Sequence, residues 1–314
     1  MNKAKTIFKL ITSYILLVLL MNIFSCGNST DKTSHSADIK SVNTIGYTLS
    51  DPDKTIILPD ILHEISGITV IDSSSVACVQ DENGVVFIFD LLKNEIKQQL
   101  FFHDDGDYEG ITVVDKTIYI LRSDGALFEI LIYGSPGSRK VKFSKDIPAN
   151  DYEGLCYDQK TNRLLIAPKG SIGKSSEKKK KRVIYGFNLN SGKLMKKPVI
   201  DFDLSKIKRF ATSNIANLPV EGKKKKQTSE PEIEFRPSDI AIHPLTNKLF
   251  ALSAMEHMLF VFDMNGTIEY IEKLNPHIFN MPEGITFLKN GDMLISNEGQ
   301  NKNPTLLRFN YKPN

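Results

Sequence analysis

Short apolar runs separated by polar turns recur along most of the chain. The clearest series has four runs, at residues 240–243, 248–252, 258–263 and 267–271. The turn Asn265-Gly266 joins the last two runs, and this dipeptide between apolar runs is typical of a β-hairpin. No helix-length pattern with a period of 3.6 residues interrupts these runs. They therefore predict an all-β fold of short antiparallel strands.

The apolar runs belong to five copies of one repeat. The position that marks the start of each copy is Gly67, Gly110, Gly154, Asp239 or Gly284. The copies recur about every 44 residues, close to the length of one propeller blade, apart from one step of about twice that length. Four antiparallel strands in each copy is the architecture of a β-propeller.

The long step after the third copy distinguishes five blades from six. Strands are predicted at 163–167, 183–188 and 197–202, and residues 203–235 that follow are polar. We interpret this polar stretch as an insertion, which favours five blades, with six as the alternative. The last copy lacks one strand. The N-terminal segment at 45–49 or 55–58 would supply that strand and close the ring, so we expect the propeller to cover residues 44–314.

The N-terminus has the three parts of a secretory signal. Lys3, Lys5 and Lys9 precede an apolar stretch at 10–24, which is shorter than the roughly 20 residues of a membrane-spanning helix. Residues 23–26, Ile-Phe-Ser-Cys, resemble the lipobox of bacterial lipoproteins. We predict a signal peptide over 1–25, lipidation of Cys26 and a flexible tether over 26–43. The protein would then be an envelope lipoprotein facing the periplasm or the cell surface. An uncleaved N-terminal anchor helix is the alternative.

The net charge is small, +3 at pH 7, but two basic runs lie at 178–182 and 223–226. They would contact anionic lipid or phosphorylated ligands, or simply be solvated loops. No aromatic residues interleave them, which argues against nucleic acid as a partner. Cys78 and Cys156 lie in apolar strand-like runs without a CxxC partner, so we expect buried thiols.

Carboxylates precede the innermost strand of nearly every blade. They are Glu64, Glu109, Glu153, Asp239 and Glu283. Innermost strands line the channel of a propeller, so these groups should crowd at one mouth and raise one another's pKa. A divalent cation would relieve the repulsion, and oxygen-only ligands favour Ca²⁺ or Mg²⁺. Alternatively, the carboxylates bond backbone amides and fix the blade corners.

Polar loops after the second strand of each blade should edge the same mouth. The candidate ligand-binding residues on them are Asp81, Glu82, Arg122, Asp124, Lys169, Glu256, Asn297 and Glu298. This mixed-sign rim is suited to a small polar ligand or ion. The chain has no P-loop, GxSxG elbow or dinucleotide fingerprint, so no reaction is indicated by a motif.

The repeat motifs resemble those of the SdiA-regulated (YjiK-like) family of bacterial envelope β-propellers. The resemblance rests on Glu64–Ile68 with Asp81-Glu82, on the Asp-Tyr-Glu-Gly copies at 107–110 and 151–154, and on Pro282–Ile285 with Asn297–Gly299. It covers roughly residues 45 to 311. It implies an association with calcium, no established reaction, and a central-site role for Glu64, Glu109, Glu153, Glu283, Asp81, Glu82 and Glu298.

Three functions follow as hypotheses. The leading one is a binding module that holds a divalent cation, calcium above others, and presents its rim to a small polar ligand or an envelope protein. The first alternative is a metal-dependent hydrolase of phosphate esters or lactones, with Lys169 or Arg122 binding the anionic group. The second is an interaction scaffold that uses the insertion at 203–235.

Overall fold

The computed structural model describes residues 45–131, 139–142, 151–170, 181–214 and 233–313. The predicted signal peptide, Cys26 and the tether lie outside these residues. The described residues form one compact unit. No helix in the described ranges is long and apolar enough to cross a membrane.

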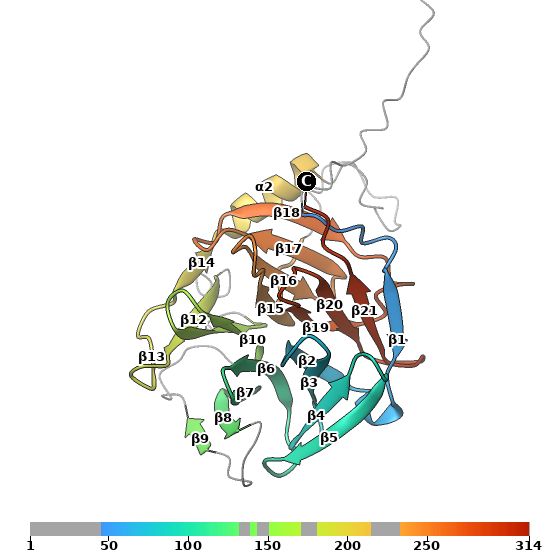
Figure 1. Ribbon diagram of the computed structural model, residues 1–314. Helices are drawn as coiled ribbons and strands as arrows, with labels where there is room; N and C mark the ends of the chain where they lie inside the picture. Colours follow the sequence, from blue (N-terminus) through green and yellow to red (C-terminus); the bar gives the residue numbers. More distant parts are fainter. Residues whose placement is uncertain (1–44, 132–138, 143–150, 171–180, 215–232, 314) are drawn as a thin grey trace, which may run out of the picture. The chain divides into compact units, whose positions relative to one another are not determined.

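Five antiparallel sheets are arranged as the five blades of a propeller (Figure 1). Blade one contains β2 (Ile65–Val70), β3 (Ser75–Gln80), β4 (Val85–Asp90) and β5 (Glu95–Phe101). Blade two contains β6 (Tyr108–Val114), β7 (Thr117–Arg122), β8 (Ala126–Leu131) and β9 (Arg139–Lys142). Blade three contains β10 (Tyr152–Asp158), β11 (Arg163–Pro168), β12 (Arg182–Asn188), β13 (Lys193–Leu194) and β14 (Ile200–Phe202). Blade four contains β15 (Asp239–Ile242), β16 (Leu249–Ser253), β17 (Met258–Phe262) and β18 (Ile268–Lys273). Blade five contains β19 (Pro282–Phe287), β20 (Met293–Asn297), β21 (Thr305–Phe309) and β1 (Lys54–Ile57). The prediction of five blades is confirmed.

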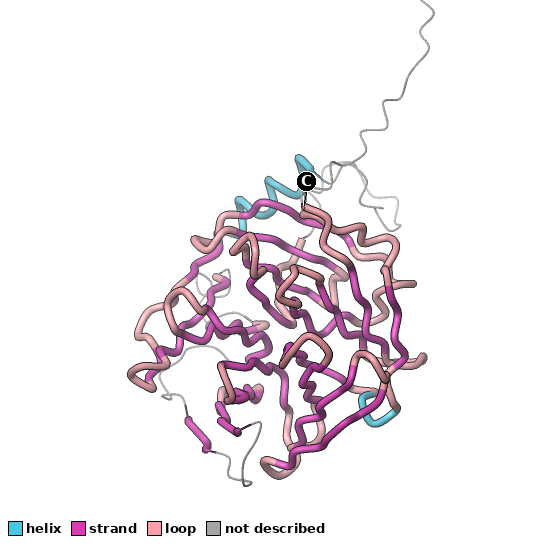
Figure 2. Tube along the Cα trace, viewed as in Figure 1, coloured by secondary structure: helices cyan, strands magenta, loops and turns pink. Residues whose placement is uncertain are grey.

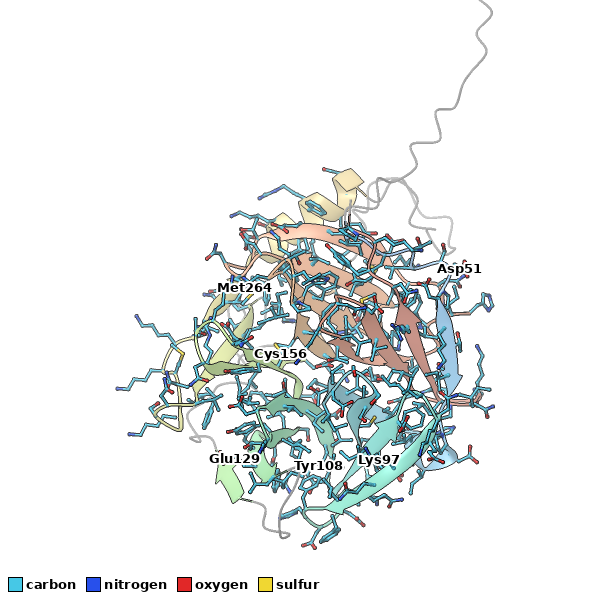
Figure 3. All side chains as sticks on the ribbon, in the orientation of Figure 1. Asp51, Lys97, Tyr108, Glu129, Cys156 and Met264 are labelled. Carbon is cyan, nitrogen blue, oxygen red and sulfur yellow. The ribbon has the colours of Figure 1, made fainter. Side chains whose placement is uncertain are left out.

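The first strand of each blade lies against the first strand of the next. Strand β2 contacts β6, β6 contacts β10, β10 contacts β15, β15 contacts β19, and β19 contacts β2. The inner strands therefore form a closed ring. Figure 2 shows these strands converging on the centre of the ring. Tyr108 of β6 and Cys156 of β10 are labelled in Figure 3. Both thiols, Cys78 and Cys156, are free and buried, as expected.

The N-terminal segment closes the ring in two ways. Strand β1 pairs antiparallel with β21, with Ile56 opposite Leu306, and so supplies the missing strand of blade five. Upstream of it, Tyr47 and Leu49 are buried in the apolar cluster between blades four and five. The Tyr47 hydroxyl donates a hydrogen bond to the carbonyl of Gly291. Both predicted segments therefore contribute, one through strand pairing and the other through side-chain packing.

The insertion after blade three contains a helix that the sequence pattern did not predict. Helix α2 (Leu204–Asn214) begins after Asp203, whose carboxylate accepts hydrogen bonds from the backbone N–H groups of Ser205 and Lys206. Its apolar residues Leu204, Ile207, Phe210 and Ala211 pack on the cluster between blades three and four. The helix was missed because polar residues outnumber this narrow apolar stripe. The second basic run lies outside the described residues.

Five apolar clusters fill the spaces between adjacent blades. The cluster between blades one and two joins Val86 of β4 to Phe128 of β8, and the one between two and three joins Leu121 of β7 to Tyr185 of β12. Each blade is therefore covered on both faces, which explains why the second and third strands are almost continuously apolar. This packing fixes the inner strands as a rigid frame.

The repeat glycines set how closely the inner strands approach. A Cβ atom on Gly67 would lie 2.5 Å from the carbonyl oxygen of Glu109 in the next blade. On Gly284 it would lie 2.7 Å from the carbonyl oxygen of Ser66, across the closure of the ring. Such distances are far inside van der Waals contact with backbone atoms that cannot move independently. Glycine is therefore required by the spacing of the blades.

Gly110→Ala tests this constraint. The added Cβ would lie 2.6 Å from Leu155 Cβ and 2.7 Å from the carbonyl oxygen of Glu153. We expect a loss of about 2 kcal/mol of stability, seen as a fall in Tm of about 4–8 °C. The control is Gly106→Ala, whose Cβ meets only side-chain atoms, the nearest at 3.2 Å. Equal falls in Tm for the two variants would contradict the account.

Candidate functional site

A β-bulge at the start of three inner strands positions one glutamate in each. In β6, Tyr108 pairs with Arg122 and Gly110 with Leu121, which leaves Glu109 as the extra residue. The same shift in register makes Glu153 the extra, unpaired residue of β10 and Glu283 that of β19. A bulge re-aims the side chain of its extra residue, and here it does so next to the ring of inner strands. The three glutamates thus take equivalent places in blades two, three and five.

Aligning the five blades on their repeat glycines changes which residues are equivalent to these glutamates. The residue before the glycine is Ser66 in blade one, and in blade four Ser238 precedes Asp239. Glu64 lies two residues earlier, before β2, and its equivalents are Asp107 and Asp151. We therefore define the inner row as the three glutamates Glu109, Glu153 and Glu283, completed by the two serines. Glu64 belongs to an outer row with the two aspartates.

The inner row is a cluster of mutually repelling carboxylates. Burial and then the Glu153 carboxylate raise the pKa of Glu109 well above its usual range. Burial and then Glu298 raise the pKa of Glu283 to about 8. Glu153 is 2% exposed, and its burial likewise raises its pKa. These three predicted site residues do converge, because each lies within electrostatic range of another.

Lys169, at the end of β11, is the basic residue in this group. Its ammonium donates a hydrogen bond to Glu153 Oε1 over 2.9 Å. Burial acts to lower the pKa of Lys169, but the Glu153, Glu283 and Glu109 carboxylates outweigh it and raise the pKa. Its positive charge in turn acts to lower the pKa of Glu298. One lysine is therefore shared among glutamates of three blades.

A second acidic group lies toward blade one. Burial, and then Glu64 and Asp107, raise the pKa of Asp81 to about 6. The oxygen Asp81 Oδ1 is buried and has no hydrogen-bond partner among the described residues. Glu298 connects this group to the inner row, because Glu64 and Asp81 both act to raise its pKa. A buried carboxylate oxygen without a donor is the kind of atom that a cation would satisfy.

Asp239 fulfils the alternative role that the sequence left open for the carboxylates. It replaces the repeat glycine in blade four and is buried. Its carboxylate accepts hydrogen bonds from three backbone N–H groups, those of Leu155 at 3.4 Å, Ile240 at 2.8 Å and Ile285 at 2.8 Å. These amides belong to the inner strands of blades three, four and five. Asp239 therefore joins three blades.

Several predicted rim residues form their hydrogen bonds outside this cluster. Arg122 donates to Asp124 through Nε and Nη2, at 3.0 and 2.7 Å. Glu256 accepts hydrogen bonds from Arg236 and Ser253. Glu82 is exposed, and Asn297 is fully buried, with its amide nitrogen donating to Thr305 Oγ1. Of the eight rim candidates, Lys169 and Glu298 lie in electrostatic range of the inner-row glutamates, and Asp81 lies in range of Glu298 and Glu64.

Sequence reasoning missed four residues around the mouth. Ser66, Asp107 and Asp151 were detectable, because aligning the repeats on their glycines places each of them in one of the two rows. His63 was not, since its Nδ1 contacts Glu64 Oε1 at 2.9 Å only once the loop before β2 is folded. That contact raises the pKa of His63.

Within the described ranges, no three His, Cys, Asp or Glu side chains are arranged to hold a metal ion. The donor set nevertheless suits a hard cation, since the clustered groups carry oxygen ligands and Asp81 Oδ1 has no donor. The role of Ca²⁺ as a cofactor stays a prediction.

The comparisons with known proteins concern the fold. No protein-family model matches the chain, and no curated protein matches it. The structure is similar to the glutaminyl cyclase of Myxococcus xanthus, with a TM-score of 0.55 and 12% identity, over 83% of this chain and 96% of that one. A chain of a nidogen/laminin complex has a TM-score of 0.47 and 12% identity, over 74% of this chain and 72% of that one. Streptogramin B lyase has a TM-score of 0.40 and 13% identity, over 78% and 66%. The cyclase similarity shows a shared fold.

The raised carboxylate pKa values predict how stability depends on pH in the presence of a chelator. A carboxyl group whose pKa is higher in the folded state stabilises the fold fully below its unfolded pKa, and that contribution is lost as the pH rises through the folded pKa. For Glu283 this window extends from about 4.5 to about 8. Between pH 6.5 and 9 we therefore expect Tm to fall by about 4 °C.

The variant Glu283→Gln should make this decline less steep, because its amide does not ionise, while the contribution of Glu109 remains. Glu95→Gln, on the exposed strand β5, should leave the decline unchanged. The range above pH 6.5 avoids His243, whose pKa burial lowers to about 4 and which therefore affects stability at more acidic pH. A decline as steep in Glu283→Gln as in the unmodified protein would contradict the assignment.

Proposed function

We propose that the protein is a binding module whose channel mouth holds a divalent cation, with Ca²⁺ as the best-suited ion. The observation that carries this proposal is the convergence of Glu109, Glu153 and Glu283 from three blades with a single shared lysine. Such an excess of buried negative charge is unfavourable until a cation or protons neutralise it. A divalent cation achieves this at neutral pH without protonating the carboxylates.

The oxygen donors explain the preference for calcium. Carboxylates are hard ligands, and Ca²⁺ accepts six to eight oxygens in flexible geometry, whereas Mg²⁺ requires a near-ideal octahedron. The inner-row glutamates Glu109, Glu153 and Glu283 would hold the ion, with Asp81, Glu298 and Glu64 beside it. The ion would supply the positive charge that the cluster lacks and would tie together blades one, two, three and five.

The contacts favour this binding role over the hydrolase alternative. Both residues that would bind the anionic group of a substrate are already bonded to carboxylates of the protein, Lys169 to Glu153 and Arg122 to Asp124. The similarity to the cyclase extends to the fold alone. In this proposal the rim serves recognition, and the ligand is a small polar molecule or an envelope protein.

Thermal unfolding in EDTA, Ca²⁺ or Mg²⁺ at pH 8 tests the cation. Because the ion binds the folded state, stability should rise with its concentration, by about 2.7 kcal/mol at a hundred times Kd. Glu109→Gln should raise Tm in EDTA, because glutamine is neutral without taking up the proton that burial forces on Glu109 at this pH, and it should weaken the response to Ca²⁺. Glu95→Gln is the matched control on the exposed strand β5. A Tm that does not respond to millimolar Ca²⁺ would overturn the proposal.

We further propose that the propeller is tethered to a membrane of the cell envelope through Cys26. Residues 23–26 have the lipobox pattern, and lipidation of Cys26 would leave the folded unit outside the cytoplasm. Cys26→Ser should move the protein from the membrane fraction to the soluble fraction and abolish incorporation of a labelled fatty acid. Retention of the variant in the membrane fraction with residues 1–25 uncleaved would instead support the anchor-helix alternative.

A further inference from the structure

Lys169 occupies a place at the mouth that an external cation would compete for. Its ammonium lies 2.9 Å from Glu153 Oε1, and the Glu153 side chain is only 3% exposed. The same ammonium lies in electrostatic range of Glu109 and Glu283. Within the described part of the chain, Lys169 is the basic side chain that forms an ion pair with one of these three glutamates. The protein thus carries its own cation in the cluster.

Removing this internal charge would leave the cluster unstable. A buried carboxylate that loses its partner is strongly unfavourable, more so when other carboxylates lie nearby. The exposed ion pairs of the protein differ in this respect. The side chains of Lys248 and Glu269, for example, are 35% and 38% exposed, and such pairs contribute little to stability. The Lys169–Glu153 pair is therefore not a surface contact, because its carboxylate is buried.

An ammonium bonded to Glu153 and a divalent cation bound by Glu153 exclude one another. The lysine occupies one carboxylate oxygen, and two positive charges a few ångströms apart repel strongly in a partly buried site. We propose that Lys169 is a tethered counter-cation, which neutralises the glutamates when no ion is bound and leaves Glu153 when a divalent cation binds. This inference rests on the proposed function and adds how that site is regulated.

The local structure permits this exchange. The backbone N–H of Lys169 donates to the carbonyl of Asp151 over 2.9 Å, so the main chain at the end of β11 is held in place. The side chain itself is 30% exposed and carries its charge on a flexible four-carbon stem. The ammonium can therefore move to solvent by rotation of the side chain, without a rearrangement of the blade.

Calorimetric titration of the purified protein with Ca²⁺ at pH 8 tests the proposal. Lys169→Met should bind Ca²⁺ at least about tenfold more tightly than the unmodified protein, equivalent to about 1.4 kcal/mol. In EDTA its Tm should be lower, and Ca²⁺ should restore it. Lys169→Arg keeps the charge and should not gain affinity. Lys248→Met, which removes a lysine at the turn between β15 and β16, should bind as the unmodified protein does.

The outcomes separate this inference from the proposed function. Binding to Lys169→Met alone, or tighter binding to it than to the unmodified protein, supports the counter-cation. Equal affinity of the two proteins overturns the counter-cation but leaves the cation site standing. Binding to neither overturns both.

A second measurement needs no variant. Acylation of lysine side chains by an amine-reactive ester, followed by mass spectrometry, reports how accessible each ammonium is. Once Ca²⁺ has raised Tm, labelling of Lys169 should increase severalfold over its rate in EDTA, while labelling of Lys248 should stay constant. Unchanged or reduced labelling of Lys169 in the Ca²⁺-bound protein would overturn the inference.

Discussion

The close approach of the five inner strands depends on glycine. At Gly67, Gly110, Gly154 and Gly284 a Cβ atom would lie within about 3 Å of the neighbouring blade. At Gly67, Gly110 and Gly284 the nearest backbone atom would be a carbonyl oxygen. The residue before three of these glycines is a bulged glutamate. The same approach that closes the ring therefore brings Glu109, Glu153 and Glu283 together, and the acidity of the mouth is a consequence of how the blades pack.

Blade four resolves this constraint differently, and its carboxylate has a different environment from the three glutamates. There the glycine is replaced by Asp239, whose carboxylate accepts three backbone N–H groups from successive inner strands. Its carboxyl group is thus used inside the scaffold. The three glutamates have Lys169 as their shared basic partner, with its ammonium bonded to Glu153. Asp239 is therefore architectural, and the three glutamates are the groups that our proposal assigns to cation binding.

Much of the fold could be predicted from the sequence, because strand periodicity and the glycine spacing are local signals. Five blades, the closing strand near residues 55–58 and the convergence of Glu109, Glu153 and Glu283 follow from them. Helix α2 could not be predicted, since its stability comes from packing Ile207 and Ala211 against blades three and four. The pairing of Arg122 with Asp124 and of Glu256 with Arg236 also depends on loop conformations that no repeat encodes. Equating Glu64 with the bulged glutamates was an error of two positions in register, which the glycine alignment corrects.

A crystal structure of the protein grown with Ca²⁺ near pH 8 tests the central claim, that the packing of the blades creates a cation site at the mouth. The account predicts an ion bound by carboxylates of Glu109, Glu153 and Glu283, with oxygens at about 2.3–2.6 Å, and the Lys169 ammonium displaced from Glu153. A mouth without an ion, in which Lys169 remains bonded to Glu153 despite saturating Ca²⁺, would contradict it.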